Sequence, residues 1–216
     1  MELFHGPVTL PGPLKYGTAA ERQVSHGILW FLKRSAALLQ AAGLVDAAGE
    51  PGLVLTEDRI EARNLGEQAS NGLPKTALSG RAEIGFLRSL TVDGLIAKSI
   101  PFEKMMTLED TCGLGNEFLC ALALKALEKG HRVQLCPSIL DSEKLEALLL
   151  PELGMAWVSD RVGIQGATLR LDGLPDPERR FALKEVMERD QELQQSLIRQ
   201  AEAQMQMAGI LYQVFE

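Results

Sequence analysis

The chain has 216 residues, of which 46% are apolar and 24% are charged, and its formal net charge is −7. These values are typical of a globular protein of one large or two small domains, and the negative charge argues against nucleic acid and anionic membranes as partners. The N-terminal sequence lacks the basic segment and apolar core of a signal peptide, and no uninterrupted apolar run approaches the roughly 20 residues of a membrane span. Three cysteines without CxxC spacing indicate neither a disulfide framework nor a zinc site. We therefore expect a cytoplasmic protein that binds no metal, nucleic acid or membrane.

The first 80 residues predict an N-terminal extension made of a helix and a hairpin. Apolar residues at helical spacing favour a helix from about residue 19 to 42, and Gly43 is a suitable stop. The rough alternation of GLVLTED and RIEARNL, residues 52–65, suggests a hairpin or edge strands. SNGLPK, residues 70–75, is the best linker candidate because Asn-Gly and Pro interrupt regular structure.

Residues 81–216 predict a second domain of the α/β class. Its expected elements are a strand over MMTLED (105–110), a helix from about 116 to 129, a strand over HRVQLCPS (131–138), a helix over DSEKLEALLL (141–150) and a strand over GMAWVSD (154–160). This alternation implies right-handed crossovers and a parallel sheet.

The C-terminal stretch from residue 176 to 216 predicts one long amphipathic helical arm, interrupted near Gly209. Its apolar residues recur at steps of three, four and seven, which leaves a narrow stripe suited to a partner helix. Two interpretations of this stripe stay open: it packs back on its own domain, or it forms a homodimer interface.

A turn with two glycines follows the MMTLED segment, at the place where a phosphate-binding loop would lie. In such a loop, backbone N–H groups and the positive end of the next helix hold an anion, a lysine neutralises phosphates, and Ser or Thr holds magnesium. The candidate nucleotide-binding residues are Asp110, Thr111, Cys112, Gly113, Leu114, Gly115, Asn116 and Glu117, together with Asp160 at the end of the last predicted strand.

The turn departs from the consensus GxxxxGK[ST] where the chemistry matters. Asp110 replaces a glycine, Asn116 the lysine and Glu117 the hydroxyl residue. These changes shift the local charge by about −3, and one like-charge contact near 4 Å costs about 4 kcal/mol at an effective dielectric near 20. ATP with magnesium is therefore expected to bind poorly. We hypothesise that the carboxylate of Asp110 or Glu117 fills the anion position from within the chain.

Residues 86–160 resemble part of a family of bacterial P-loop ATPases of poorly defined function, which carry two tandem NTPase modules in one chain. The family pattern is FxxAxTPxG, a GxPGTGKST loop with its helix, a KGxxV strand, a DPxSLD helix and a PELxxA strand; this chain has FLRSLTVDG, TLEDTCGLGNEFL, KGHRVQLC and DSEKLEALLLPELGMAWVSD in that order. The later segments match through Lys129, Gly130, Val133, Asp141, Leu145, Pro151, Glu152, Leu153 and Ala156. The resemblance implies a sheet of P-loop NTPase type. It also makes the first 80 residues a candidate relic of a first module, and FHGPVTLPG at the N-terminus is weakly echoed by FLRSLTVDG 82 residues later.

The favoured function is that of a non-catalytic, NTPase-derived binding or assembly protein, with no catalytic residue and an unidentified small-molecule ligand. One alternative is an ATP-binding enzyme, an ATPase or a kinase-like protein, with an atypical phosphate loop. The other is a structural homo-oligomer that uses the C-terminal helix. Among single residues, we expect Cys120, Trp30 and Trp157 in the core and His131 at the surface. A redox role is considered for Cys112, because a helix N-terminus can lower the pKa of a thiol.

Overall fold

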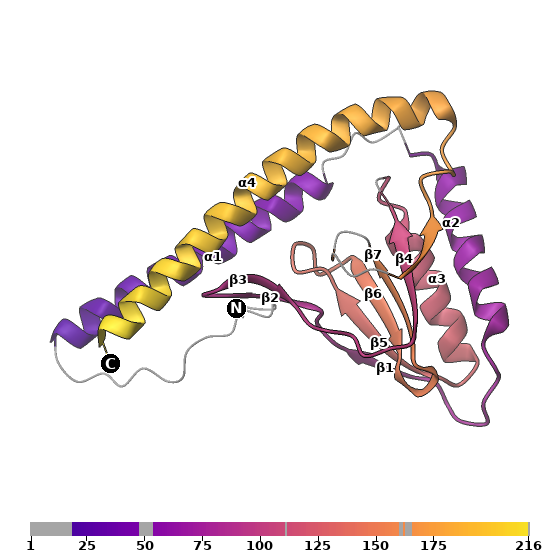
Figure 1. The fold of residues 1–216 in the computed structure, drawn as a ribbon, viewed down its shortest axis with the longest axis horizontal. Coiled ribbons are helices and arrows are strands. Elements are labelled where there is room, and N and C mark those ends of the chain that lie inside the picture. Colours follow the sequence, from indigo (N-terminus) through magenta and orange to yellow (C-terminus); the bar gives the residue numbers. More distant parts are fainter. Residues whose placement is uncertain (1–18, 48–53, 111, 160–161, 163–165, 216) are drawn as a thin grey trace.

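The computed structural model describes residues 19–47, 54–110, 112–159, 162 and 166–215, which form a body and an arm (Figure 1). The arm is a pair of long helices, α1 (Ala19–Ala47) and α4 (Pro177–Phe215). The body contains the elements between them, a six-stranded sheet with two helices over one face. The expected α/β class with a long C-terminal helix is confirmed.

Most strands of the sheet run in the same direction. Their order across the sheet is β1 (Arg81–Ile84), β5 (Arg132–Pro137), β6 (Leu145–Leu150), β7 (Met155–Ser159), β4 (Lys104–Glu109) and β8 (Ala167–Arg170). Only β6 is antiparallel to its neighbours, β5 and β7. The strands expected over MMTLED, HRVQLCPS and GMAWVSD are confirmed as β4, β5 and β7, and β4 lies inside the sheet between β7 and β8.

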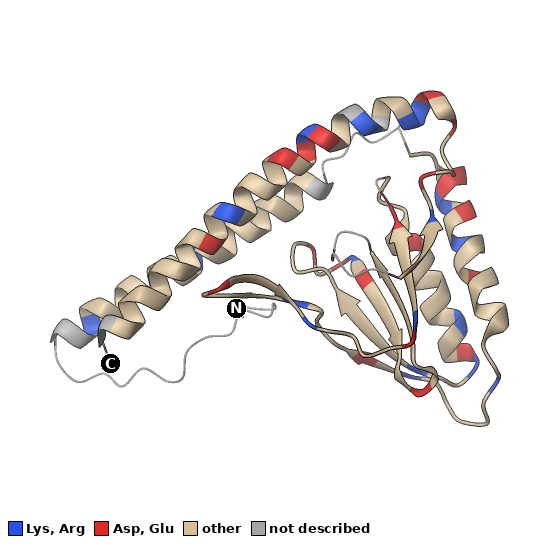
Figure 2. Cartoon of the chain, in the orientation of Figure 1, with Lys and Arg blue, Asp and Glu red and all other residues tan. Residues whose placement is uncertain are grey.

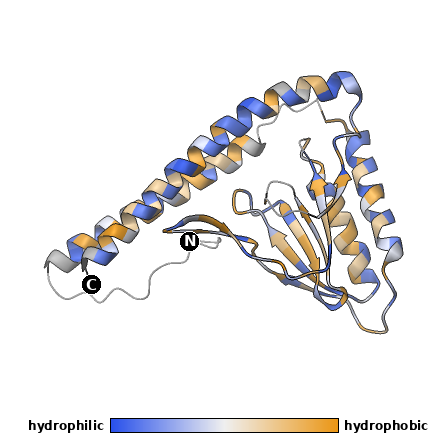
Figure 3. Cartoon of the chain, viewed as in Figure 1, coloured by the Kyte–Doolittle hydropathy of each residue, from blue (hydrophilic) through white to orange (hydrophobic). Residues whose placement is uncertain are grey.

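Two helices cover one face of the sheet. α3 (Gly115–Glu128) lies on the strands, as expected from the sequence, and α2 (Thr56–Ala69) packs on α3. Phe118 and Leu122 of α3 are fully buried in the core beneath it, together with Trp157 of β7. Figure 3 shows the hydrophobic residues gathered in α3 and the strands, because these elements enclose the main core.

Helix α2 corrects the hairpin or edge strands predicted over residues 52–65. Ala62 and Ala69 lie two helical turns apart and both pack on the core around α3. Gly66 allows the helices to approach closely, since a Cβ atom there would lie 2.3 Å from the carbonyl oxygen of Phe118. The short alternation in the sequence is therefore outweighed by helix-to-helix packing that the sequence alone does not reveal.

Strand β6 corrects the helix predicted over residues 141–150. It fills the gap between β5 and β7, with Leu148 in the core beside α3 and Leu149 in the core on the opposite face of the sheet. A strand that is buried on both faces is a continuous apolar run, which periodicity does not distinguish from a buried helix. The local pattern is ambiguous, and pairing with the neighbouring strands decides it.

The second face of the sheet is covered by the chain between β1 and β4. Within it, β2 (Arg88–Thr91) and β3 (Gly94–Ala97) form an antiparallel hairpin that reaches the arm. At the base of this hairpin, Arg88 forms an ion pair with Glu146 of β6, and both side chains are nearly buried. Burial raises the pKa of the Glu146 carboxyl, although Arg88 opposes this effect.

The helices of the arm are antiparallel. Ser35 Oγ donates a hydrogen bond to the carbonyl of Ala201 (2.8 Å), and Gln194 Nε2 donates to the carbonyl of Ala42 (3.2 Å). The core of the arm contains Ile28, Leu32, Leu39, Ala201, Met205 and Ala208, together with Leu90 of the hairpin. The apolar stripe of α4 thus packs on the chain itself. A homodimer through residues 176–216, and the division of the chain at residue 80, stay predictions.

Two glycines of the arm lie where the helices contact the body, and the helices are not broken at either position. α1 continues through Gly43, the predicted stop, to Ala47, and a Cβ atom at Gly43 would lie 1.9 Å from the carbonyl oxygen of Leu140. α4 is unbroken at Gly209, where a Cβ atom would lie 2.7 Å from Cγ1 of Val92 in the hairpin. The predicted stop and interruption are both wrong, because tertiary contacts explain these glycines.

Helix α1 is long and apolar enough, from Arg22 to Val45, to cross a membrane by length and composition, and no other helix in the described part of the chain meets this criterion. A core helix of a soluble protein passes the same test. Ile28 and Leu32 are buried against other elements of the chain, so one side of α1 is used for packing.

Candidate functional site: the glycine turn after strand β4

The glycine turn joins the carboxyl end of β4 to the first turn of α3. Its order of strand, tight turn and helix is the one expected from the sequence. Ligands of parallel α/β sheets are commonly bound at the carboxyl ends of the strands. The contacts of each side chain in this turn therefore decide whether an anion has access to the helix.

Asp110 occupies the N-terminal end of α3. Its side chain is nearly buried, with 7% of the residue exposed. Oδ1 accepts a hydrogen bond from the backbone N–H of Leu114 (2.6 Å), and Oδ2 accepts one from Gly115 (2.7 Å). These N–H groups and the helix dipole are the features that bind a phosphate in a working loop. The expected internal carboxylate at the N-terminus of α3 is thus that of Asp110, and its equivalence to the anion position of a phosphate-binding loop stays a prediction.

The structure explains why glycine is needed at both positions of the turn. Gly113 has φ +74°, a left-handed conformation that residues with a side chain rarely adopt. Gly115 provides room for the carboxylate, since a Cβ atom there would lie 2.7 Å from Oδ2 of Asp110. The GxG pattern is therefore accounted for by the shape of a self-capped turn.

Asn116 and Glu117 face neighbouring elements of the body. Oδ1 of Asn116 accepts a hydrogen bond from the backbone N–H of Leu145 (2.9 Å), which ties α3 to β6. Glu117 forms ion pairs with two arginines of α2, Arg63 at 2.6 Å and Arg59 at 3.4 Å. Glu117 thus does not take the anion position, and its interaction with Arg63 raises the pKa of that guanidinium.

No motif in the sequence connects Arg59 and Arg63 with the glycine turn. Their four-residue spacing places them on one face of a helix, but the expected hairpin over residues 52–65 would have separated them. The helical repeat of α2 is the feature that could have identified them. Together with Glu117, they form the polar edge between α2 and α3.

Two cysteines lie in or near the turn, and Cys120 is not in the core as expected. Cys112 is buried, with 7% of the residue exposed, which does not favour reaction with a dissolved oxidant. Cys120 is exposed on α3 and not in the core, and its thiol lies 3.6 Å from Oδ1 of Asn116, one helical turn earlier. Partial burial, with a contribution from Glu117, raises the pKa of the Cys120 thiol.

Thr111 and Asp160 lie outside the described residues, so the structure does not place them relative to the turn. Next to the turn, Arg170 of β8 forms an ion pair with Glu109 at the end of β4 (2.8 Å). Within the described ranges, no group of three or more His, Cys, Asp or Glu residues is arranged to hold a metal ion.

Two further single-residue expectations are wrong. His131 is buried, and its Nε2 atom lies 2.6 Å from the carbonyl oxygen of Pro74, because the segment after α2 folds over the entry to β5. Trp30 is 52% exposed on α1, whereas Trp157 is buried in the body as expected.

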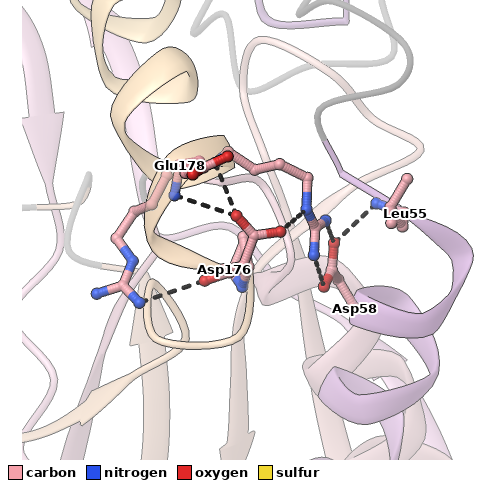
Figure 4. A network of polar contacts seen from close by, with 7 residues as sticks. Leu55, Asp58, Asp176 and Glu178 are labelled. Carbon is pink, nitrogen blue, oxygen red and sulfur yellow. Dashed lines mark hydrogen bonds and ion pairs between the residues drawn. The ribbon is translucent and has the colours of Figure 1, made fainter.

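A second polar cluster joins the arm to the body at the N-terminal ends of α2 and α4 (Figure 4). The guanidinium of Arg179 bridges the carboxylates of Asp58 and Asp176. Oδ2 of Asp58 also accepts a hydrogen bond from the backbone N–H of Leu55 (2.8 Å). The hydrogen bond from Arg179 lowers the pKa of Asp58, and the two carboxylates raise the pKa of Arg179. Asp58 and Arg179 are 121 positions apart, so no local pattern predicts this contact.

Comparison with known proteins does not extend this description: no protein-family model, no curated protein and no solved structure matches the chain.

Proposed function

We propose that the protein is a non-catalytic binding or assembly protein on an NTPase-like α/β scaffold, in which the glycine turn is a structural cap. The observation that carries the proposal is the pair of hydrogen bonds from Leu114 and Gly115 to the carboxylate of Asp110. A nucleotide phosphate bound in the usual way would need these same donors.

Electrostatics also oppose a nucleotide at this position. A phosphate oxygen about 4 Å from the Asp110 carboxylate would be repelled by about 4 kcal/mol at an effective dielectric near 20, a loss of about a thousandfold in affinity. Asn116 stands at the lysine position, and its side-chain oxygen is engaged by Leu145. The position that would supply a compensating cation therefore has none.

The direct test is thermal unfolding with and without Mg-ATP at neutral pH. We expect no rise in the melting temperature of the wild type, because a ligand stabilises only by binding the folded state. The variant Asp110→Gly/Asn116→Lys/Glu117→Ser restores the consensus residues, and we expect it to gain stabilisation by Mg-ATP. The single variant Glu117→Ser is the control, because Asp110 still caps the helix in it.

The outcomes test two statements separately: that Asp110 caps α3, and that the fold has an NTPase origin. Micromolar Mg-ATP binding by the wild type would overturn the proposed function. A triple variant that folds and gains nothing would remove the support for an NTPase origin and leave the structural cap in place.

An ATP-binding enzyme with an atypical loop is a second candidate, because β4, the turn and α3 follow in the order of a phosphate loop. In that case, a magnesium ion would have to lie between the Asp110 carboxylate and the phosphates. ATP would then stabilise the wild type with magnesium and not with EDTA present, which is the result that distinguishes this candidate.

A structural homo-oligomer is a third candidate, favoured by large apolar side chains on the exposed side of α4. Phe181, Leu193 and Ile210 are 69%, 52% and 52% exposed. Light scattering over a range of protein concentrations tests it. A dimer that is lost in Leu193→Gln/Ile210→Gln would support this candidate, and a monomer at all concentrations would eliminate it.

A further inference from the structure

The side of α1 that α4 does not cover combines cations with apolar side chains. Trp30 and Leu29 are 52% and 36% exposed, and Arg22, Lys33 and Arg34 are exposed beside them. The guanidinium carbon of Arg34 lies 5.2 Å from the centre of the Trp30 ring. We call these five residues the α1 face.

The stretch of α1 that carries the α1 face has no acidic residue, although Glu21 and Asp46 of the same helix lie next to its two ends. The sequence from Arg22 to Val45 contains three basic residues and neither Asp nor Glu, and His26 is exposed on the same helix. This distribution contrasts with the net charge of −7 for the whole chain. An average over the chain therefore does not describe the charge that this surface presents.

Among the residues that the structure describes, the neighbouring part of α4 adds no exposed acid. The hydrogen bond from Ser35 to Ala201 sets the antiparallel register, so the α1 face lies beside the C-terminal half of α4. In that half, Arg199 is exposed, and the carboxylate of Glu202 accepts a hydrogen bond from the backbone N–H of Leu95 in the hairpin (3.0 Å). The cluster Glu188, Asp190 and Glu192 lies nearer the body, as the red segments of α4 in Figure 2 show.

We propose that the α1 face docks on the surface of a lipid bilayer that contains anionic phospholipids. Lys and Arg are attracted to the negative headgroups, with about fivefold in partitioning for each residue near the surface. A half-exposed Trp is suited to the headgroup region because its ring is amphipathic. A helix with cations and Trp or Leu on its free face therefore has the chemistry of an interfacial helix.

The packing of α1 favours a helix that lies on the surface over one that spans the bilayer. Its other side is buried against α4 and the hairpin through Ile28, Leu32 and Leu39. Insertion across a bilayer would remove these contacts, whereas surface docking leaves them intact. The proposal departs from the expectation of no membrane partner because docking depends on one face and not on the net charge.

A second copy of the chain is a less suitable occupant of the same face. Two copies placed face to face about a two-fold axis would bring Arg22, Lys33 and Arg34 of one copy close to the same residues of the other. Like charges at short range oppose this arrangement. Anionic headgroups provide the opposite charge over the whole face.

The protein carries its own fluorescent reporter for the test. It has two tryptophans, and Trp157 is buried in the body while Trp30 is exposed. With vesicles of phosphatidylcholine and phosphatidylserine, we expect the full chain to co-sediment and its Trp emission to shift to shorter wavelength. Vesicles of phosphatidylcholine alone should give neither result. Raising the salt from about 0.1 M to about 1 M shortens the Debye length from about 10 Å to about 3 Å and should release the protein.

Matched variants locate the interaction. Lys33→Gln/Arg34→Gln should reduce partitioning to the anionic vesicles by about 25-fold, because two cations are removed. Lys75→Gln/Lys104→Gln removes the same charge from exposed positions of the body and should bind as the wild type does. Circular dichroism checks that both variants are folded, and the salt dependence of the wild type tests the proposal without any variant.

Three results would overturn the proposal. The first is no co-sedimentation, or equal co-sedimentation with both kinds of vesicle. The second is equal loss of binding in the two double variants, which would show that net charge and not the α1 face is responsible. The third is a dimer in light scattering with a blue-shifted Trp30 emission in the absence of vesicles, which would make a second copy the occupant.

Discussion

The body and the arm differ in which side chains they bury. In the body, carboxylates are engaged within the chain: Asp110 caps α3, and Glu146 pairs with Arg88. In the arm, a narrow core of small and medium side chains holds two helices together, and large side chains such as Trp30 and Phe181 stay exposed. These buried carboxylates of the body are satisfied within the chain, whereas the proposed docking surface belongs to the arm.

The largest expected difference between the two regions is in their response to loss of an aromatic ring. Phe118→Ala in the body should reduce the free energy of unfolding by about 3 to 5 kcal/mol, because the side chain is fully buried and leaves a cavity. Phe181→Ala in the arm should change it by less than about 0.5 kcal/mol, since that ring is 69% exposed. Urea denaturation measures both, and similar losses would show that the arm is packed as the body is.

A smaller effect is expected from removing the cap of α3. Asp110→Ala leaves the buried N–H groups of Leu114 and Gly115 without their acceptor, which should cost about 2 kcal/mol in urea denaturation. Glu117→Ala in the next turn removes only ion pairs with exposed arginines and should cost less than about 1 kcal/mol. Equal costs would argue that Asp110 is not specifically the cap.

A glycine pair in α1 tests the contact between arm and body. Gly43→Ala should destabilise the protein by about 1 to 2 kcal/mol, because its Cβ atom would collide with the carbonyl oxygen of Leu140. Gly27→Ala has only the flexible end of Leu211 nearby and should stabilise the helix by up to about 1 kcal/mol. If thermal unfolding shows both variants gaining stability, the loop between β5 and β6, which contains Leu140, does not contact α1 in solution.

The smallest effect is the pH dependence of the cluster between arm and body. Arg179 lowers the pKa of Asp58 in the folded state. The contribution of this ion pair to the free energy of unfolding is therefore complete above the unfolded pKa of Asp58, near 4, and is lost as the pH falls through its folded pKa. The advantage of the wild type over Arg179→Gln in urea denaturation should therefore shrink as the pH falls below about 4. Arg180→Gln is the control, since Arg180 donates to the carbonyl of Pro175 and not to Asp58. A constant advantage down to pH 3 would contradict the role of Asp58.

Local patterns predicted several elements correctly. The helix at 116–129, the strands β4, β5 and β7 and the C-terminal helix each have a clear apolar pattern bounded by glycine, proline or capping residues. The glycine turn was also located correctly. The exchange of consensus residues for Asp110, Asn116 and Glu117 was enough to suggest an internal carboxylate at the helix end.

The remaining errors occur where distant segments decide the outcome. Residues 145–150 form a strand because β5 and β7 leave a gap for one, and α2 is a helix because α3 offers a matching surface. Gly43 and Gly209 lie inside helices because Leu140 and Val92 approach them. The contacts of α2, Gly43 and Gly209 join residues far apart in the chain, so no short window contains both partners. The partners of β6 are near in sequence, but its local pattern fits a buried helix as well as a buried strand.

By itself, the sequence determined the local preferences of this protein: its apolar periods, its charges and the positions of its glycines. The tertiary structure decided which carboxylate takes the N–H groups of α3 and which side of α1 remains free. The physical reason is that hydrogen bonding and burial depend on which atoms meet in space. Asp110 caps α3 because β4 delivers it to the helix end, and Trp30 is exposed because α4 covers the opposite side of α1.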